Sequence, residues 1–237
     1  MPQEYPIILR GFPGTVKRVD DIDGRDIYLP VEAARPLAVI VYLHDDDPAG
    51  RKSGPDLGRF FTERGFAMVS TNCASGALEE VQQTIQWISD KADEYGFNPD
   101  RVGLWGLGMG GRLAVAAALV PDSGVKAVVA AYPEGDVPAP VKETGAPPIL
   151  LVHGLADEIR PVSKTETLFD ALGVSGNEVT MCLVERHGNR FMENNTFDQG
   201  DFPRVRKYEC RGGEPPVISE APPFTFGTVE TFFRRWL

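Results

Sequence analysis

The stretch RVGLWGLGMGGRLAVAAAL (residues 101–119) joins an apolar run, a cluster of glycines and an alanine-rich segment without a break. The run Val102–Trp105 predicts a buried strand, and the segment Arg112–Leu119 predicts a helix. Turns that connect a strand directly to a helix through glycines carry ligand or catalytic groups in several α/β folds. The stretch therefore predicts a strand–turn–helix unit with a functional turn.

Apolar runs alternate with helical patterns along most of the chain. Near-continuous apolar strands separated by helices predict a parallel sheet that is covered on both faces. The first 30 residues predict additional antiparallel edge strands. The predicted strands are 37–43, 66–71, 102–105, 125–131, 149–152 and 179–184, and the predicted helices are 57–65, 78–95, 112–119, 163–172 and 228–236.

Composition bounds the class of protein. The chain has 237 residues, 42% of them hydrophobic, and a net charge of −10, which disfavours nucleic acid and anionic membranes as partners because both reward clustered Lys and Arg. Its three cysteines are widely spaced and form no CxxC pair, so we expect neither a disulfide framework nor a zinc site. With no signal pattern in Met1–Arg10 and no uncharged apolar stretch of about 18 residues, we expect a cytoplasmic protein.

The whole chain, residues 1–237, is predicted to form one α/β domain without a separate cap domain. One segment stands apart, because 189–226 is polar, rich in proline and weakly periodic. A loop of this length in a compact domain is usually functional or mobile. We therefore expect an irregular excursion, either a surface loop or a cover over the active site.

The glycine cluster fits two motifs. The first is the dinucleotide fingerprint G-x-G-x-x-G, formed by Gly106, Gly108 and Gly111 and followed by the acidic Glu134 after the next strand. Its glycines would let a pyrophosphate approach the helix N-terminus. However, the fingerprint normally follows the first strand of its unit, whereas here at least two strands come earlier. A dinucleotide-binding oxidoreductase is therefore the least favoured interpretation.

The second motif is the nucleophile elbow G-x-Nuc-x-G at residues 106–110. The elbow exposes its central residue, Gly108, at the top of the sheet, and the N–H of Met109 points to where an oxyanion forms. This interpretation requires an acid and then a histidine after later strands. Asp157 follows the strand 149–152, and His187 follows the strand 179–184, so we predict His187 as a general base oriented by Asp157. His44 and His153 are expected to have structural roles in holding loops.

These motifs together resemble the α/β-hydrolase superfamily and, within it, the dienelactone hydrolase family. The resemblance covers roughly Leu37 to His187 and the last helix. It implies a fold with a mostly parallel sheet and helices on both faces, and a small carbonyl, ester or lactone substrate. Family members carry an acidic residue after the strand that corresponds to LAVIVYLH, which implies a tuning role for Asp45 and an oxyanion-hole N–H from Asp46.

The sequence departs from the family at Gly108, where relatives carry cysteine or serine. Glycine has no side chain, so no acyl-enzyme can form there. Cys73 follows another strand, but we expect it to be a buried, inert thiol. The carboxylates at 45–47 would disfavour an anionic intermediate nearby unless they point away, and three adjacent residues rarely converge on one metal ion.

Three interpretations remain open. In the favoured one, His187 and Asp157, with Asp45 nearby, perform non-acylating acid/base chemistry of an isomerase, cyclase or lyase type, or activate water. In the second, an ester or lactone hydrolase has had its nucleophile at position 108 replaced by glycine. In the third, a pseudoenzyme binds a ligand or partner. We expect a small-molecule substrate, no cofactor and no metal; the sequence does not predict the oligomeric state.

Overall fold

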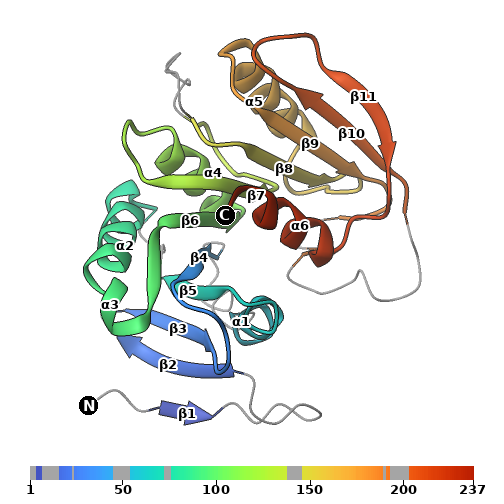
Figure 1. The fold of residues 1–237 in the computed structure, drawn as a ribbon. Coiled ribbons are helices and arrows are strands. Elements are labelled where there is room, and N and C mark those ends of the chain that lie inside the picture. Colours follow the sequence, from blue (N-terminus) through green and yellow to red (C-terminus); the bar gives the residue numbers. More distant parts are fainter. Residues whose placement is uncertain are drawn as a thin grey trace.

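The fold is described from a computed structural model (Figure 1). The structure describes residues 4–6, 16–22, 24–44, 54–71, 76–137, 146–188, 191–192 and 203–237.

One sheet of 11 strands runs through the molecule in the order β1-β2-β3-β5-β4-β6-β7-β8-β9-β10-β11. The six central strands, β5 to β9 with β4 between β5 and β6, are mutually parallel. The strands at both ends pair antiparallel. The bounds are β1 (Glu4–Pro6), β2 (Val16–Ile22), β3 (Arg25–Pro30), β4 (Leu37–Leu43), β5 (Ala67–Thr71), β6 (Phe97–Leu107), β7 (Val125–Ala131), β8 (Ile149–Gly154), β9 (Val179–Val184), β10 (Val205–Cys210) and β11 (Val217–Ala221).

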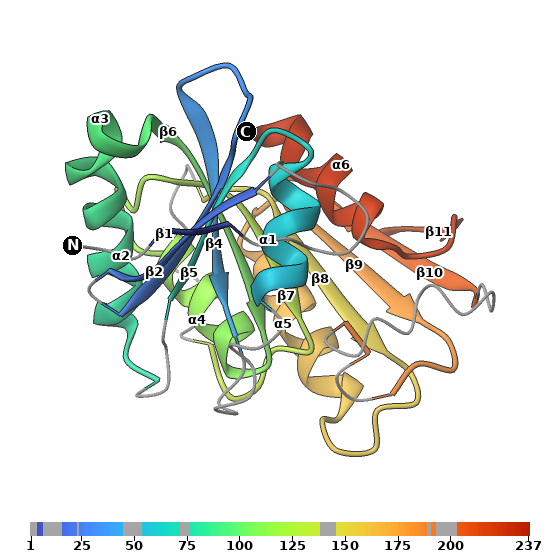
Figure 2. The same cartoon turned by 90° about the horizontal axis from the view of Figure 1, so that it is seen from below.

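Helices cover both faces of this sheet, as predicted. α1 and α6 lie on one face, and α2, α4 and α5 lie on the other (Figures 1 and 2). The bounds are α1 (Gly54–Thr62), α2 (Leu78–Asp90), α3 (Ala92–Tyr95), α4 (Met109–Ala118), α5 (Val162–Val174) and α6 (Phe226–Trp236).

The alternation of side chains along β4 explains why two hydrophobic cores form. Val39, Val41 and Leu43 belong to the core under α2, α4 and α5. Ile40 and Tyr42 belong to the core under α1 and α6. Successive residues of a strand point to opposite faces, so a strand that is apolar at every position is buried only when both faces are covered.

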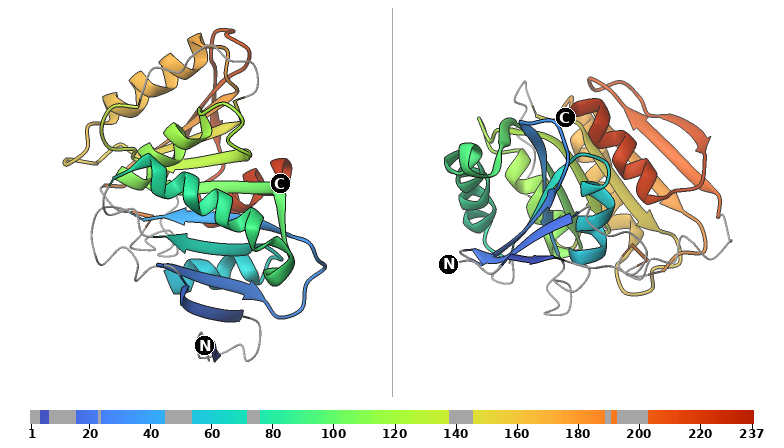
Figure 3. Two further views of the ribbon diagram at one scale, coloured as in Figure 1. Left: turned by 90° about the vertical axis from the view of Figure 1, so that its left-hand side faces the viewer. Right: turned by 60° about the horizontal axis from the view of Figure 1, so that its bottom comes forward.

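The segment 189–226 differs from the expectation of an irregular excursion. It contains β10 and β11, an antiparallel pair that continues the sheet beyond β9 (Figure 3). β10 is buried only at its two end residues, Val205 and Cys210, and β11 is exposed along most of its length. Neither strand therefore has the apolar run of a central strand. The prolines that suggested a loop lie outside the two strands. Residues 189–190 and 193–202 lie outside the described part of the chain.

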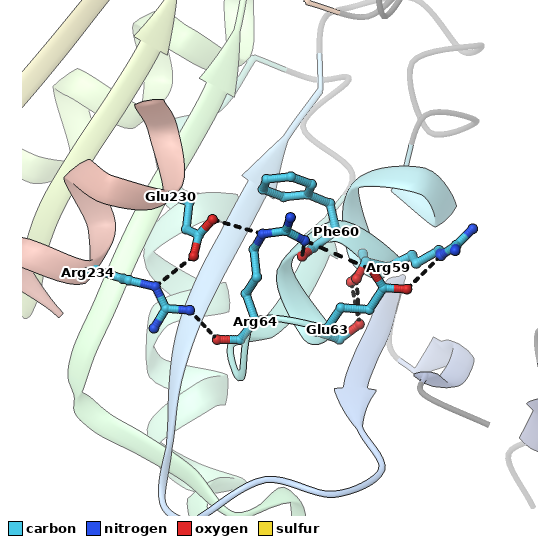
Figure 4. A network of polar contacts seen from close by, with 8 residues as sticks. Arg59, Phe60, Glu63, Arg64, Glu230 and Arg234 are labelled. Atoms are coloured by element: carbon cyan, nitrogen blue, oxygen red, sulfur yellow. Dashed lines mark hydrogen bonds and ion pairs between the residues drawn. The ribbon is translucent and has the colours of Figure 1, made fainter. Parts of the chain in front are cut away.

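Polar contacts join α1 and α6 on their shared face (Figure 4). The Glu230 carboxylate accepts from Nε of Arg64 at 2.8 Å and from Nε of Arg234 at 2.7 Å. Arg234 also donates to the carbonyl oxygen of Arg64 at 2.8 Å, and the Arg64 guanidinium lies 3.7 Å from the centroid of the Phe60 ring. The network links the turn after α1 to α6 through partly exposed groups.

Several boundaries differ from the sequence prediction. β6 begins at Phe97 rather than 102, α4 begins at Met109 rather than 112, and the predicted helix 78–95 is split at Lys91 into α2 and α3. Tertiary pairing lengthens β6, because its first residue pairs with Leu37 of β4. Within the described ranges, no helix is long and apolar enough to cross a membrane.

Candidate active site

The turn at Gly108 has the backbone geometry of an elbow. Gly108 lies between β6 and α4 with φ 53° and ψ −118°, a conformation that L-residues rarely adopt. Its N–H donates to the carbonyl of Ala131 at 3.0 Å, and its carbonyl accepts from the N–H of Glu134 at 3.0 Å. The turn is therefore held by backbone bonds to the end of the neighbouring strand β7.

Close contacts explain the glycines on either side of this turn. A Cβ at Gly106 would lie 2.1 Å from the carbonyl oxygen of Gly110, and a Cβ at Gly110 would lie 2.2 Å from that of Leu43. A Cβ at Gly111 would lie 3.1 Å from the carbonyl oxygen of Ala131. These glycines permit the strand, the helix and β4 to approach one another, which is the packing that the elbow interpretation requires.

The Glu134 carboxylate is engaged with Arg160 rather than open to a ribose. Arg160 donates to Glu134 Oε2 from both Nε and Nη2 at 2.8 Å. The glycine cluster also follows β6, in the middle of the sheet. Both observations favour the elbow interpretation over the dinucleotide fingerprint.

The turns that carry Gly108, Asp157 and His187 lie at one edge of the sheet. They follow β6, β8 and β9, which belong to the parallel set, so their carboxyl ends meet at the same edge. The N–H of Ala156 donates to the carbonyl of His187 at 2.8 Å. A Cβ at Gly154 would lie 2.3 Å from that carbonyl oxygen. The turn that carries Asp157 (the acid turn) and the turn that carries His187 (the histidine loop) are therefore in direct backbone contact.

The carboxylate of Asp157 is buried, with a side chain that is 1% exposed. Its Oδ1 accepts from the N–H groups of Ile159 at 2.9 Å and Arg160 at 2.8 Å. Its Oδ2 is buried without a hydrogen bond in the described part of the chain. Within the described residues, no hydrogen bond or ion pair joins this carboxylate to the His187 ring. The two N–H bonds orient the carboxylate within its own turn, and its pairing with His187 stays a prediction.

His153 is hydrogen-bonded to the acid turn and has the structural role expected for it. The ring is fully buried; Nε2 donates to the carbonyl of Arg160 at 3.1 Å, so Nδ1 accepts from the Thr165 hydroxyl at 2.7 Å. Burial lowers the pKa of His153, against the opposing effects of the Arg160 carbonyl and the Asp157 charge. Nε2 lies 3.6 Å from Oδ2 of Asp157, and because the ring is neutral this is a close contact and not an ion pair.

The structure adds aromatic residues that sequence reasoning missed. The His187 ring packs edge-on against Phe191, with centroids 5.2 Å apart. Tyr132 follows β7, is fully buried at φ 38°, and packs against Phe191 and His153. In the sequence, the one sign that Tyr132 lies near the site is its position directly after a predicted strand. Its positive φ could not be predicted, because no sequence pattern indicates a positive φ at a tyrosine. The rings of His187, Phe191, Tyr132 and His153 therefore form one chain of contacts.

Met109 and His44 are the remaining described residues among those that the sequence singled out. Met109 is the first residue of α4 and is half-buried, so its N–H belongs to the helix N-terminus beside the elbow. His44 is buried at the end of β4. Asp45, Asp46 and Cys73 lie outside the described residues. Within the described ranges, no cluster of three potential metal ligands occurs.

Comparisons with known proteins agree with this geometry. The BD-FAE family profile matches residues 25–142, a range that contains the elbow but ends before Asp157 and His187. No curated protein sequence matches the chain.

Solved structures match this chain over most of its length. A truncated carbohydrate esterase from gut microbiota superposes with a TM-score of 0.61 at 20% identity, over 74% of this chain and 91% of that one. Native esterase 2 of the planctomycete Thermogutta terrifontis has the same TM-score at 18% identity, over 84% and 86%. Its paraoxon-phosphorylated form matches at 20% identity and a TM-score of 0.61, over 81% and 89%. The resemblance to dienelactone hydrolases in particular stays a prediction, and the chain has the α/β-hydrolase fold.

Proposed function

We propose that the protein hydrolyses a small ester or lactone by direct attack of water, without an acyl-enzyme. The esterases that share its fold support hydrolysis as the reaction class. Gly108 supports the absence of an acyl-enzyme, since position 108 offers no nucleophile. This proposal joins the hydrolase alternative from the sequence with the non-acylating use of His187.

The buried Oδ2 of Asp157 carries the proposal. A buried carboxylate oxygen without a hydrogen bond is costly and is retained mainly where function needs it. This oxygen lies in the turn whose backbone binds the carbonyl of His187. An imidazole N–H of His187 is the partner that would satisfy the oxygen and would fix the tautomer needed in a general base.

The proposed reaction has two proton transfers. His187 takes a proton from water, and the resulting hydroxide attacks the ester carbonyl while the N–H groups of Met109 and Asp46 stabilise the oxyanion. The bond to the leaving alcohol then breaks, and the imidazolium returns its proton to the alkoxide. The products are a carboxylic acid and an alcohol, or a hydroxy acid from a lactone. The space left by the absent side chain at Gly108 admits the attacking water.

Hydrolysis of p-nitrophenyl acetate tests the mechanism. We expect steady turnover without a burst, and a loss of about 10²-fold or more in kcat for His187→Ala. A burst in the wild type, or unchanged activity in His187→Ala, would contradict the proposal.

Labelling with paraoxon tests the nucleophile position separately. Since phosphorylation requires a nucleophile, we expect no mass increase in the wild type and one phosphoryl adduct in Gly108→Ser, with Gly108→Ala as the matched control. An adduct in the wild type or in Gly108→Ala would place a nucleophile elsewhere and overturn the non-acylating mechanism.

An acid/base isomerisation would use the same two residues, and the absence of a nucleophile at Gly108 favours it equally. The two reactions differ in whether oxygen from solvent enters the product. Turnover in H₂¹⁸O, with mass spectrometry of the acid formed, should show one ¹⁸O per hydrolysis. Product formation without ¹⁸O would favour isomerisation.

A further inference from the structure

A groove lies beside α6, separate from the residues of the predicted catalytic site. Its volume is about 580 Å³, which is within the range of small-molecule pockets. It is lined by residues of α6 on one side, by the segment 221–225, and by residues of β8, β9 and β10, which form its floor. Figure 1 shows how these elements are arranged. Gly108, Asp157 and His187 do not line it.

The groove exists because α6 covers only part of this face. Val229 and Phe233 are buried under the helix, and α6 contacts β7. Thr228, Thr231 and Phe232 are directed instead toward the groove. The sheet continues past the helix through β9 and β10, so these strands present a face that the helix does not cover.

The floor is apolar at Val205 and Cys182, and it also carries Thr180, Lys207 and Glu209 on the same face. The register pairs Lys207 of β10 with Cys182 of β9 and Val205 with Val184, so Val205 and Cys182 belong to one face. Both are buried, as is Phe224, which also lines the groove. Burial raises the pKa of the Cys182 thiol to about 12, so the thiol is neutral and behaves as a small apolar group. Trp236 and Phe232 add aromatic surface to the wall.

Charge is distributed unevenly among the ionic residues that line the groove. Lys207 and Glu209 pair with each other at 3.0 Å, and Glu178 lies 4.0 Å from Arg211. Arg235 lies over the Trp236 ring, 4.8 Å from its centroid. Among the described residues, Arg235 makes no ion pair with a carboxylate. The groove therefore combines apolar surface, a mutually neutralising Lys207–Glu209 pair, and one cationic group that lies against an aromatic ring.

We propose that this groove binds a monocarboxylate with an aromatic or branched apolar body. The body lies on the floor beside Trp236, and the carboxylate accepts two N–H bonds from the Arg235 guanidinium, whose planar fork matches a carboxylate. One uncompensated cation complements a single negative charge. The site is independent of the hydrolysis proposed above.

Isothermal titration with 4-phenylbutyrate and its neutral analogue 4-phenylbutan-1-ol tests the site on the full chain. We expect Arg235→Gln to weaken binding of the carboxylate by about tenfold or more and to leave binding of the alcohol unchanged. Arg206→Gln is the matched control, because Arg206 is exposed on β10 and points to the opposite face. We expect that control to bind both compounds like the wild type.

Thr231→Trp tests the location of the site. Thr231 is exposed on α6 and lines the groove, so the larger side chain should fill the space without altering the core. We expect binding of both compounds to be lost. Absence of millimolar binding in the wild type, equal weakening by Arg235→Gln and Arg206→Gln, or retained binding in Thr231→Trp would each overturn the proposal. Binding is measured directly, so the result does not depend on whether the protein hydrolyses esters.

Discussion

The turn at Gly108 and the turn at Asp157 lie at the same edge of the sheet but are built differently. Backbone contacts hold the first: Gly108 bonds to Ala131 and Glu134, and the glycines around it allow chain segments to touch. Side chains hold the second, through the bonds of Asp157 to its own turn and of His153 to Thr165. One turn depends on residues without side chains, and the other depends on particular side chains.

The difference explains why glycine at position 108 is compatible with the shape of the turn. No side chain at position 108 contributes to the bonds that hold the elbow, so glycine there leaves the turn intact. The acid turn has no such freedom, because removing either His153 or Thr165 leaves a buried polar atom without its partner. Substitutions at the two turns should therefore have different consequences for stability.

The largest effect is expected for Gly106→Ala. The new Cβ would meet the carbonyl oxygen of Gly110 at 2.1 Å, and because backbone atoms cannot move aside cheaply, the free energy of unfolding should fall by about 3 kcal/mol or more. Urea denaturation measures the loss.

Gly176→Ala is the matched control for that variant. Gly176 has a positive φ of 84°, which Gly106 does not have, and a Cβ there meets no atom within 4 Å. It should therefore show only the backbone strain, about 1 kcal/mol. Similar losses in the two variants would mean that close approach does not shape the elbow.

Thr165→Val should destabilise the acid turn by about 1–3 kcal/mol, because it leaves Nδ1 of the buried His153 without a donor. The two side chains have the same shape, so packing is unchanged. Thr167→Val on the same helix is the control, since the Thr167 hydroxyl donates to the Ser163 carbonyl at an exposed position. A loss no larger than that of Thr167→Val would show that the Thr165 bond does not hold the turn.

Low pH should lower the free energy of unfolding through His153, which packs beside Asp157 in the acid turn. Its pKa in the folded protein is lowered by burial, so below about pH 6.5 the unfolded chain takes up a proton that the folded chain resists. The stabilisation by neutral His153 is complete above that pH and falls as the pH drops toward the folded pKa. Urea denaturation at pH 7.5, 6.5 and 5.5 should show the difference between wild type and His153→Gln shrinking in acid. A constant difference would contradict this assignment.

The smallest effect is expected for Glu230→Gln, far from both turns in the network between α1 and α6 (Figure 4). Glu230 bonds Arg64 and Arg234, whose side chains are 34% and 52% exposed. Exposed ion pairs contribute little, so the loss should be about 1 kcal/mol or less. Glu94→Gln, which removes the exposed contact with Lys91, should cause no measurable change. A loss as large as that of Thr165→Val would mean that surface charges stabilise this fold as strongly as the buried turn.

The central sheet could be predicted because its signal is local. The run Leu37–Leu43 is apolar at every position and forms β4, buried throughout. The sequence also shows that the elbow, the acid and the histidine each follow a strand, and the structure places all three turns at one edge of the sheet. The pair β10 and β11 could not be predicted in this way, since their side chains are mostly exposed or half-buried and their pairing is determined by the free edge of β9.

The sequence by itself determined the alternation of strands and helices and the glycines of the elbow, because periodicity and the absence of a Cβ act on neighbouring residues. Only the tertiary structure decided how the Asp157 carboxylate is bound in its turn and that His153 and Thr165 are hydrogen-bonded to each other beside it. It also decided that Phe191 packs against both Tyr132 and His187. Those arrangements depend on side chains that are distant in the chain and meet only after the sheet has formed, and their geometry depends on burial and hydrogen bonding that no local pattern records.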